Sequence, residues 1–403
     1  MSKINELILE LCPNGVEYKN IKDLCFENFW VMPSTPNYQN KGIPYITSKN
    51  IRNGIVMFDD VKYITEEDYK TISNNRPITE NDFLISMIGT IGEVGIVRKE
   101  DLPFYGQNMY LLRLNTNLIN IKYFYHYFTS EMVRKKLLGE KNNGNQGYLK
   151  TKNIESLKVP VPPLEVQNEI VRILDKFGEL EAELEAELEA RKSQYEFWRG
   201  KIINMYENKN IKLSDMAKVY DGTHSTPNYQ ENGIPFISVE NISDIYGSNK
   251  FISKEDYMKY KIKPEINDVF MTRIGTIGKC SVFEKQIDLA YYVSLALIRP
   301  NTEIILPKYL KYVIESNVGK DELYKRTLVH AVPIKVNKDE IGKIVLPVPS
   351  IEDQKKIISK LDRFESLTES ISVGLPAEIE LRRKQYEYYR KKLLSFEELS
   401  VSE

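Results

Sequence analysis

The fold is decided by a stretch that the chain contains twice, first as Ser34-Thr-Pro-Asn-Tyr-Gln-Asn-Lys-Gly-Ile-Pro-Tyr-Ile46 and again as Ser225-Thr-Pro-Asn-Tyr-Gln-Glu-Asn-Gly-Ile-Pro-Phe-Ile237. Three more pairs follow in the same order in both copies: Asp82-Phe-Leu-Ile-Ser-Met-Ile-Gly-Thr-Ile-Gly92 with Asp268-Val-Phe-Met-Thr-Arg-Ile-Gly-Thr-Ile-Gly278, Pro160-Val-Pro162 with Pro347-Val-Pro349, and Arg191-Lys-Ser-Gln-Tyr-Glu196 with Arg382-Arg-Lys-Gln-Tyr-Glu387. Because the order is kept throughout, the chain is an internal duplication, and each copy is one structural unit.

Each copy begins with a globular part. Short runs rich in β-branched and aromatic residues are separated by Gly, Pro and Asn, which is the pattern of strands joined by turns. In the first copy we expect strands within residues 42–47, 82–88, 95–97 and 110–114. The prolines at Pro160 and Pro347 then mark the end of each globular part.

Each copy ends with a helical part. From Val166 to Ile202, apolar residues recur at steps of three and four with one step of seven, which predicts a long helix with an apolar seam. The second copy has a similar seam from Ile357 to Leu393. It is interrupted by Gly374 and Pro376, where we expect the helix to break or restart with the proline in a first turn.

Two apolar seams of similar length in one chain most simply bury each other. The sequence therefore predicts an α+β fold: two tandem α/β domains separated by two long antiparallel coiled-coil helices, related by a pseudo-twofold internal repeat. An antiparallel pair would place the globular parts at opposite ends. The expected boundaries are residues 1–162 for the first domain, 163–206 for the central helix, 207–349 for the second domain and 350–403 for the C-terminal helical region.

The composition is that of an ordinary soluble protein, with 42% apolar and 28% charged residues among 403. No apolar run approaches a membrane span, the N-terminus lacks the build of a signal peptide, and three scattered cysteines give neither a disulfide framework nor a metal clip. We therefore expect a cytoplasmic protein.

The net charge of −1 argues by itself against a nucleic-acid binder. Six of the glutamates, however, lie at alternate positions from Glu179 to Glu189. Without those six, 51 acidic residues face 56 basic ones, a balance of +5. Charge thus permits nucleic-acid binding without requiring it.

Catalytic motifs are absent from the sequence. The histidines His126, His224 and His330 lie far apart without metal-binding spacing, and we expect no metal site. The two Gly-Thr-Ile-Gly motifs lack the ending of a phosphate-binding loop, so we interpret each as a tight hairpin turn. No methyltransferase motif or convincing cluster of nuclease carboxylates is present, and we expect neither catalysis nor a cofactor.

These doubled motifs resemble the specificity subunits of type I restriction–modification systems over essentially the whole chain. The resemblance is carried by residues 160–170 and 349–357, by the Arg-x-x-Gln-Tyr-Glu helix ends at Tyr195 and Tyr386, and by Asp221-Gly-Thr-His-Ser-Thr-Pro227. One departure is that the first copy has Trp30-Val-Met-Pro-Ser-Thr-Pro36 at this last position, so no role of His224 carries over to it.

The resemblance implies that each globular part is a target-recognition domain for one half of a bipartite, asymmetric site in double-stranded DNA. It also implies that the helices dock two methyltransferase subunits, which bind S-adenosylmethionine and modify adenines, and that motor-nuclease subunits join for restriction. The chain itself would be non-catalytic.

Three identical Glu-Leu-Glu-Ala tetrads at residues 179–190 resemble the spacer repeats of one subgroup of that family. Gln167 and Gln354 are 187 residues apart, whereas Arg191 and Arg382 are 191 apart, so the second copy is longer here and shifted in helical phase. Each tetrad adds about 6 Å and about 40° of rotation, and one DNA base pair turns by roughly 34°. The glutamates themselves fit a solvated face, but we expect the number of tetrads to set the geometry between the two heads. The spacer-helix positions are Leu180, Leu184 and Leu188.

Sequence readers use hydrogen-bonding side chains on loops. In the first domain the DNA-binding candidates are Ser34, Thr35, Asn37, Lys49, Thr90, Asn108, Asn145, Gln146 and Lys150. In the second they are Thr223, His224, Ser225, Thr226, Asn228, Arg273, Thr276, Lys279, Arg326 and His330. The candidates for partner binding are Gln167, Tyr195, Trp198, Gln354, Tyr386 and Tyr389.

Two readings stay open within these loops. The segment 141–150 is rich in glycine and amides, which suits close approach to DNA but fits a mobile surface loop equally well. Tyr38 and Tyr229 belong to the shared motif, and we interpret them as packed rather than stacked on bases. Because Met87 and Glu93 stand where the second copy has Arg273 and Lys279, the two heads should read different sequences.

Two functions of other classes remain as alternatives. The near-neutral charge also suits a coiled-coil adaptor whose heads bind proteins, and a nuclease with an unrecognised site is the third hypothesis. Salt-dependent binding of one specific duplex would separate the first from a DNA reader. Metal-dependent cleavage by the isolated chain would reveal the nuclease.

Overall fold

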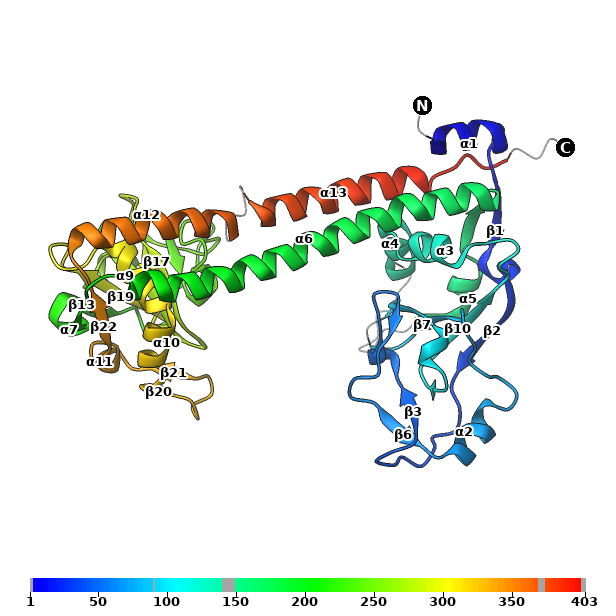
Figure 1. Ribbon diagram of the computed structural model, residues 1–403, viewed down its shortest axis with the longest axis horizontal. Coiled ribbons are helices and arrows are strands. Elements are labelled where there is room, and N and C mark those ends of the chain that lie inside the picture. The colour runs from blue at the N-terminus through cyan, green and yellow to red at the C-terminus, as the bar shows by residue number, and fades with distance from the viewer. Residues whose placement is uncertain (1–2, 90, 140–148, 369–373, 400–403) are drawn as a thin grey trace. The chain divides into compact units, whose positions relative to one another are not determined.

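The structure is a computed structural model that describes residues 3–89, 91–139, 149–368 and 374–399 (Figure 1). It divides into two compact units, one within Met1–Glu183 and Glu380–Glu403 and the other within Leu184–Ile379. The helices α6 (Leu164–Asn204) and α13 (Leu375–Leu393) contribute residues to both units. Each globular part is therefore completed by helical residues from both copies of the repeat.

Unit 1 is built on an antiparallel sheet of order β2-β10-β7-β8. Its strands are β2 (Cys25–Val31), β7 (Phe83–Ser86), β8 (Val94–Ile96) and β10 (Met109–Leu114). Three smaller sheets join β1 (Glu17–Asn20) to β11 (Lys158–Val161), β4 (Ile51–Arg52) to β5 (Ile55–Val56), and β3 (Ile43–Ile46) to both β6 (Lys62–Ile64) and β9 (Tyr105–Gly106). The helices are α1 (Lys3–Leu11), α2 (Glu66–Ser73), α3 (Ile121–Phe128), α4 (Glu131–Gly139) and α5 (Thr151–Glu155). The strands predicted for the first copy are confirmed.

Unit 2 repeats this topology. Its main sheet has the order β13-β19-β16, with β17 also paired to β16, and is extended beyond β16 by β21 and β20. These strands are β13 (Ala217–Asp221), β16 (Val269–Ile274), β17 (Thr276–Val282), β19 (Leu295–Pro300), β20 (Thr327–Leu328) and β21 (Lys335–Val336). The small sheets are β15 (Phe251–Ile252) with β14 (Ile234–Ile237) and β18 (Ala290–Tyr291), and β12 (Lys209–Lys212) with β22 (Val345–Val348).

The helices of unit 2 also follow the order of unit 1. They are α7 (Leu213–Met216), α8 (Lys254–Met258), α9 (Pro307–Glu315), α10 (Asn317–Tyr324), α11 (Lys338–Ile341) and α12 (Ile351–Thr368). The second helical part is thus described as two helices, α12 and α13, with residues 369–373 outside the described ranges. Pro376 lies in the first turn of α13, as predicted, where its missing amide hydrogen leaves no helical bond unmade.

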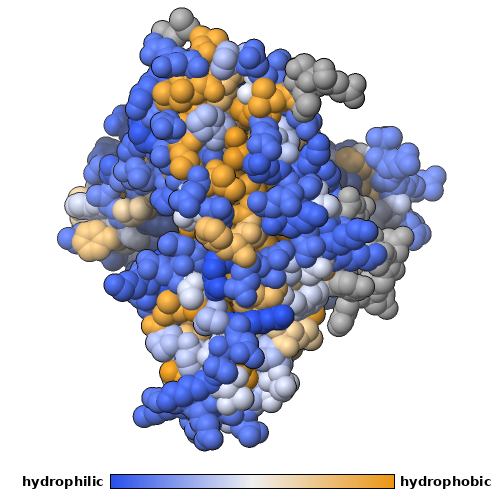
Figure 2. Space-filling model, turned by 90° about the vertical axis from the view of Figure 1, so that its right-hand side faces the viewer, coloured by the Kyte–Doolittle hydropathy of each residue, from blue (hydrophilic) through white to orange (hydrophobic). Residues whose placement is uncertain are grey.

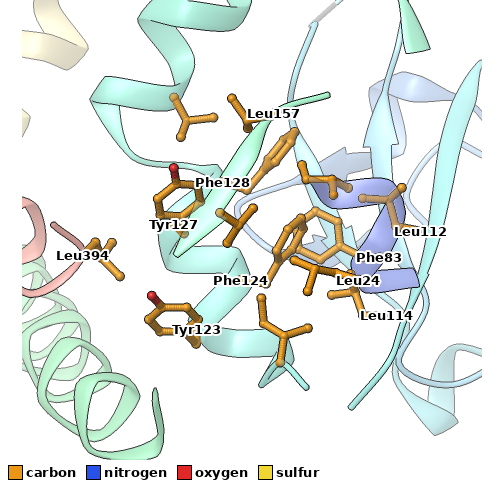
Figure 3. Close-up of a cluster of buried hydrophobic side chains, with 14 of the residues drawn as sticks. Leu24, Phe83, Leu112, Leu114, Tyr123, Phe124, Tyr127, Phe128, Leu157 and Leu394 are labelled. Atoms are coloured by element: carbon orange, nitrogen blue, oxygen red, sulfur yellow. The ribbon is translucent and has the colours of Figure 1, made fainter. Parts of the chain in front are cut away.

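The larger core cluster of unit 1 lies between α3 and the main sheet. Figure 3 shows Phe124 and Phe128 of α3 directed toward Phe83 of β7, while Tyr123 faces away from that ring. The ring centres of Phe83 and Phe124 are 4.8 Å apart in an edge-to-face arrangement. The hydroxyl of Tyr123 donates to the carbonyl oxygen of Pro160 at 3.0 Å, which satisfies the polar end of a fully buried ring.

A buried glutamine joins helix and globular part identically in the two units. The side chain of Gln167 accepts from the amide of Asn120 at 2.7 Å and donates to the carbonyl oxygens of Leu118 and Pro162. In unit 2 the side chain of Gln354 accepts from Leu306 at 2.8 Å and donates to two carbonyls in the same way. Both glutamines are 0% exposed. Their prediction as partner contacts is therefore wrong, because the side chains are enclosed and fully bonded within the chain.

A buried arginine near the end of each long helix donates hydrogen bonds to the globular part of the other copy. In unit 1 Arg390 of α13 donates to the carbonyl oxygen of His126 at 2.8 Å. In unit 2 Arg199 of α6 donates to the carbonyl oxygen of Glu315 at 2.6 Å. Arg390 and Arg199 occupy the same place in the repeated motif. The helix end of each copy therefore contributes its arginine to the globular part of the other copy.

Replacing Gln167 with leucine should lower the free energy of unfolding by about 3 kcal/mol, because one amide and two carbonyl groups lose their partner in a buried place. Urea denaturation followed by tryptophan fluorescence measures the change. As a control, Asn168→Ala removes one exposed hydrogen bond with Asn120 and should change stability by less than about 1 kcal/mol. Equal effects of the two substitutions would contradict the structural role of Gln167.

Candidate nucleic-acid interface

The shared Ser-Thr-Pro-Asn-Tyr-Gln loops are held by their backbone and leave their polar side chains exposed. The amide of Gln39 donates to Tyr63 at 2.8 Å in unit 1, and the amide of Gln230 donates to Phe251 at 2.9 Å in unit 2. The candidates in these loops are all exposed: Ser34, Thr35, Asn37, Ser225, Thr226 and Asn228. An anchored loop with free hydrogen-bonding groups is the arrangement that sequence reading requires.

The tyrosines of the two loops pack on their own domains. The ring of Tyr38 lies 5.7 Å from that of Tyr45, and the ring of Tyr229 lies 5.7 Å from that of Phe236. A lysine stands over each ring, Lys62 in unit 1 and Lys250 in unit 2. The tyrosines are 38% and 46% exposed, so the packed interpretation is supported for one face of each ring.

An open pocket of about 620 Å³ adjoins the second loop. Thr223, Ser225 and Asn228 line one part of it, and the segment that follows α8 supplies Lys259, Tyr260 and Lys261. Gly222 fits only as glycine, because a Cβ there would stand 2.5 Å from the backbone of Tyr292. His224 is exposed on the same loop.

Sequence reasoning missed the residues on the α8 side of this pocket. Lys259 pairs with Asp256 at 2.6 Å, and Lys261 is exposed. A run of Lys, Tyr and Lys before a proline was the available signal. It could not be used because the contact with residues 223–228 is formed only by folding.

The second Gly-Thr-Ile-Gly motif forms the tight hairpin turn that was predicted. Ile274 of β16 lies opposite Thr276 of β17, with Gly275 at a φ of 78° between them. Glycine adopts this left-handed conformation without strain. Thr276 and Lys279 are exposed beside the turn, as a contact with phosphate would require. In the first copy Thr90 lies outside the described residues, and so do Asn145 and Gln146.

Arg273 does not reach the surface, and its prediction as a DNA contact is wrong. It is 7% exposed, its Nε donates to the carbonyl oxygen of Val293 at 2.9 Å, and its Nη1 lies 3.2 Å from a carboxylate oxygen of Asp221. A guanidinium held this way braces β16 against β13 rather than reading DNA.

The remaining candidates are placed less uniformly. Lys49 is exposed and pairs with Asp60 at 2.7 Å. Asn108 is half-buried in a turn with a φ of 66°, and Lys150 precedes α5 with its side chain exposed. Arg326 pairs with Glu322 at 3.0 Å, whereas His330 is exposed.

The helical parts pack through aromatic and charged residues within each unit. In unit 1 a hydrogen bond with His126 at 2.9 Å, reinforced by Lys122, lowers the pKa of Asp175. The other nitrogen of His126 lies 3.2 Å from the hydroxyl of Tyr386. In unit 2 Tyr195 is buried at 3% and stacks on Phe364, so neither tyrosine is freely available to a partner.

Trp198 and Tyr389 remain open to solvent, each 37% exposed. Trp198 meets Phe197 edge-to-face at 5.6 Å, and Tyr389 meets Tyr388 in the same way at 5.4 Å. The repeat thus places an exposed aromatic pair on each long helix.

The three tetrads fall within α6. Leu180, Leu184 and Leu188 are half-buried, whereas most of the intervening glutamates are exposed. Glu181 is the half-buried exception, and it pairs with Arg383 of α13 at 2.6 Å within unit 1. This is the amphipathic pattern that the sequence predicted for a solvated helix face.

In the described ranges, no helix combines the length and the apolar character that a membrane crossing requires. No three His, Cys, Asp or Glu side chains in the same ranges are grouped so that they could hold a metal ion. On the face drawn in Figure 2, hydrophilic surface is interrupted by hydrophobic groups that gather toward the top.

Replacing Arg273 with methionine should destabilise the protein by about 2 kcal/mol, because the carboxylate of Asp221 loses its buried partner. Lys279→Met is the matched control: its side chain is exposed, and the change should stay within about 0.5 kcal/mol. Chemical denaturation of the two variants makes the comparison. If Arg273→Met left the free energy of unfolding unchanged, the buried structural role of Arg273 would be contradicted.

Comparison with known proteins gives a consistent result. The family described as "Type I restriction modification DNA specificity domain" matches residues 13–190 and 205–381. A putative type I restriction enzyme specificity subunit of Haemophilus influenzae is 32% identical over 292 residues, covering 69% of this chain and 73% of the relative. The EcoR124I/EcoR124II specificity subunit of Escherichia coli is 32% identical over 297 residues, covering 68% of this chain and 71% of that protein.

The fold is also found among solved structures. A chain from a structural study of the assembly of a type I restriction–modification system aligns with a TM-score of 0.62 at 15% identity. The alignment covers 95% of this chain and 98% of that one. At this identity the likeness concerns the fold alone.

Proposed function

We propose that this chain, which belongs to the family of type I restriction–modification DNA specificity proteins, reads a bipartite, asymmetric DNA sequence and catalyses no reaction itself. The observation that carries the proposal is a scaffold kept in both units while charged residues at equivalent positions near the shared loops and turns differ. Lys49 in unit 1 stands where unit 2 has Glu240, and Glu93 stands where unit 2 has Lys279. Glu93 is half-buried and the other three side chains are exposed, and reversed charges at equivalent positions suit two different half-sites.

The helical parts serve as spacer and docking site in this proposal. An antiparallel coiled coil of α6 with α12 and α13 would separate the heads, and the tetrads would fix their distance and rotation. Antiparallel packing within each unit supports this: Phe177 stacks on Tyr389 at 5.5 Å while Glu181 pairs with Arg383, and Tyr195 stacks on Phe364 while Tyr206 accepts from Lys360.

The exposed aromatic pairs would each dock one methyltransferase subunit. The Phe197–Trp198 pair belongs to unit 2 and the Tyr388–Tyr389 pair to unit 1, which suits two copies of one partner. Aromatic residues are enriched at the centres of protein interfaces. Those subunits would bind S-adenosylmethionine and methylate adenines in the cytoplasm. Motor-nuclease subunits would complete the restriction complex.

The complex of this chain with its methyltransferase subunits should prefer one bipartite duplex over a scrambled one by roughly a thousandfold or more at about 0.15 M salt. The sequence to test comes from mapping methylated adenines in the genome that encodes the chain. Gel shifts at two salt concentrations measure the preference. Equal binding of all duplexes would refute the proposed function.

Deleting one tetrad, residues 187–190, should shorten the preferred spacer by about one base pair, since about 40° of helix rotation nearly equals one step of DNA. Methylation mapping of cells that carry the deletion gives the new spacer. The paired substitutions Glu183→Gln and Glu187→Gln keep the length of the helix and should keep the spacer. A spacer that changes with the charge of the helix rather than with its length would overturn the proposal that the tetrads set the spacing.

A further inference from the structure

We infer that the tip of the hairpin between β20 and β21, residues 328–334, is an apolar wedge that enters a base step of duplex DNA at the half-site read by unit 2. The inference rests on the proposed function and adds a mode of reading. The duplex would be recognised there through its readiness to unstack and kink rather than through hydrogen bonds to base edges.

The tip is apolar and open to solvent. Its sequence is Leu328-Val-His-Ala-Val-Pro-Ile334, and Val332 is 100% exposed. Leu328, Val329 and Ile334 are 47%, 41% and 39% exposed. A run of exposed aliphatic side chains is unfavourable in water, so its presence on a folded surface marks a site of interaction.

The stem beneath the tip is fixed at several points. Leu328 pairs with Lys335 across the hairpin, and Lys335 also pairs with Ile274 of the main sheet. The amide of Gly275 donates to the carbonyl oxygen of Ile334 at 2.8 Å, which ties the hairpin to the β16–β17 turn. In Figure 1 the loop beyond β20 and β21 projects from the body of its unit. A wedge must be held in this way, because a pliable loop would fold back instead of separating stacked bases.

Charge around the tip favours nucleic acid as the occupant. Residues 325–336 contain Lys325, Arg326 and Lys335. Lys325 and Arg326 both pair with Glu322, at 2.8 and 3.0 Å, so the exposed Lys335 carries the basic charge of the hairpin itself. Lys279, exposed on β17, follows the turn to which the hairpin is tied. A basic rim around an aliphatic point matches a duplex, in which phosphates flank an apolar stack of bases. A protein partner would be matched by the apolar tip but would have no general need for the basic rim.

The wedge belongs to one copy only. Between α4 and α5 the first copy has Lys141-Asn-Asn-Gly-Asn-Gln-Gly-Tyr-Leu-Lys150, where the second has the aliphatic run. Most of that segment lies outside the residues that the structure describes, so the two copies are compared at this position by sequence alone. A kink is therefore expected in one half-site and not in the other.

The test uses the whole complex with its methyltransferase subunits, bound to the duplex identified by methylation mapping. The base analogue 2-aminopurine, which brightens when it is unstacked, is placed at successive positions across both half-sites. The wild-type complex should raise its fluorescence severalfold at one step in one half-site. Val332→Ser should abolish that rise and weaken binding of the specific duplex roughly tenfold, whereas Val332→Leu should keep both.

Val332 is fully exposed, so neither substitution disturbs packing. Met205→Ser is the matched control, because Met205 is 61% exposed directly after α6 and lies off the hairpin. It should leave fluorescence and affinity unchanged.

The outcomes separate the wedge from the proposed function. If the wild-type complex prefers its sequence but Val332→Ser keeps the fluorescence and the affinity, the wedge is wrong and the function stands. If the wild-type complex prefers no sequence, the function itself fails. If Val332→Ser no longer assembles with the methyltransferase subunits on size exclusion, the tip binds protein and the wedge is overturned.

Discussion

Each globular part depends on an arginine from the helix of the other copy. Arg390 bonds the carbonyl of His126 in unit 1, and Arg199 bonds the carbonyl of Glu315 in unit 2. Both are almost fully buried, at 6% and 3% exposure. A guanidinium enclosed to this degree must keep its acceptors, because a buried charge without partners is very unfavourable. Neither copy is therefore complete by itself, because each globular part uses the helix of the other copy.

The same constraint separates the parts of the chain that must stay constant from those that can vary. The glutamines at 167 and 354, the arginines at 199 and 390, and the tyrosines that bond Pro160 and Pro347 recur at equivalent places with equivalent partners. The Ser-Thr-Pro-Asn-Tyr-Gln loops also recur, whereas other surface positions differ between the copies, as Lys49 and Glu240 do. Proteins that hold reading groups on loops above a fixed scaffold change specificity in the loops alone.

Much of the fold could be predicted because the chain contains the same motifs twice, in the same order. The repeat, the strands around Ile43–Ile46 and Phe83–Ser86, the tight turn at Gly275 and the restart at Pro376 all follow from local patterns of glycine, proline and apolar residues. Local patterns report burial poorly, however. Arg273 has the chemistry of a DNA contact, and Gln167 and Gln354 have the chemistry of partner contacts, but tertiary packing places all three inside.

The site was predictable to a lesser degree for the same reason. Exposed polar residues such as Ser34 and Ser225 could be selected by type, since loops carry them outward. The pocket beside Lys259 and Lys261 joins residues distant in sequence, and no spacing reveals it. The apolar tip at Val332 was overlooked because hydrophobic residues are ordinarily assigned to a core.

The anchoring of the shared loops through the main-chain amides of Gln39 and Gln230 has an evolutionary consequence. Every residue except proline offers the same amide, so the hold on the loop does not depend on which side chain stands there. Mutations in the neighbouring exposed positions leave the folding free energy nearly untouched. A lineage can thus acquire new targets by drift in a few codons, while the body that carries them needs no compensating change.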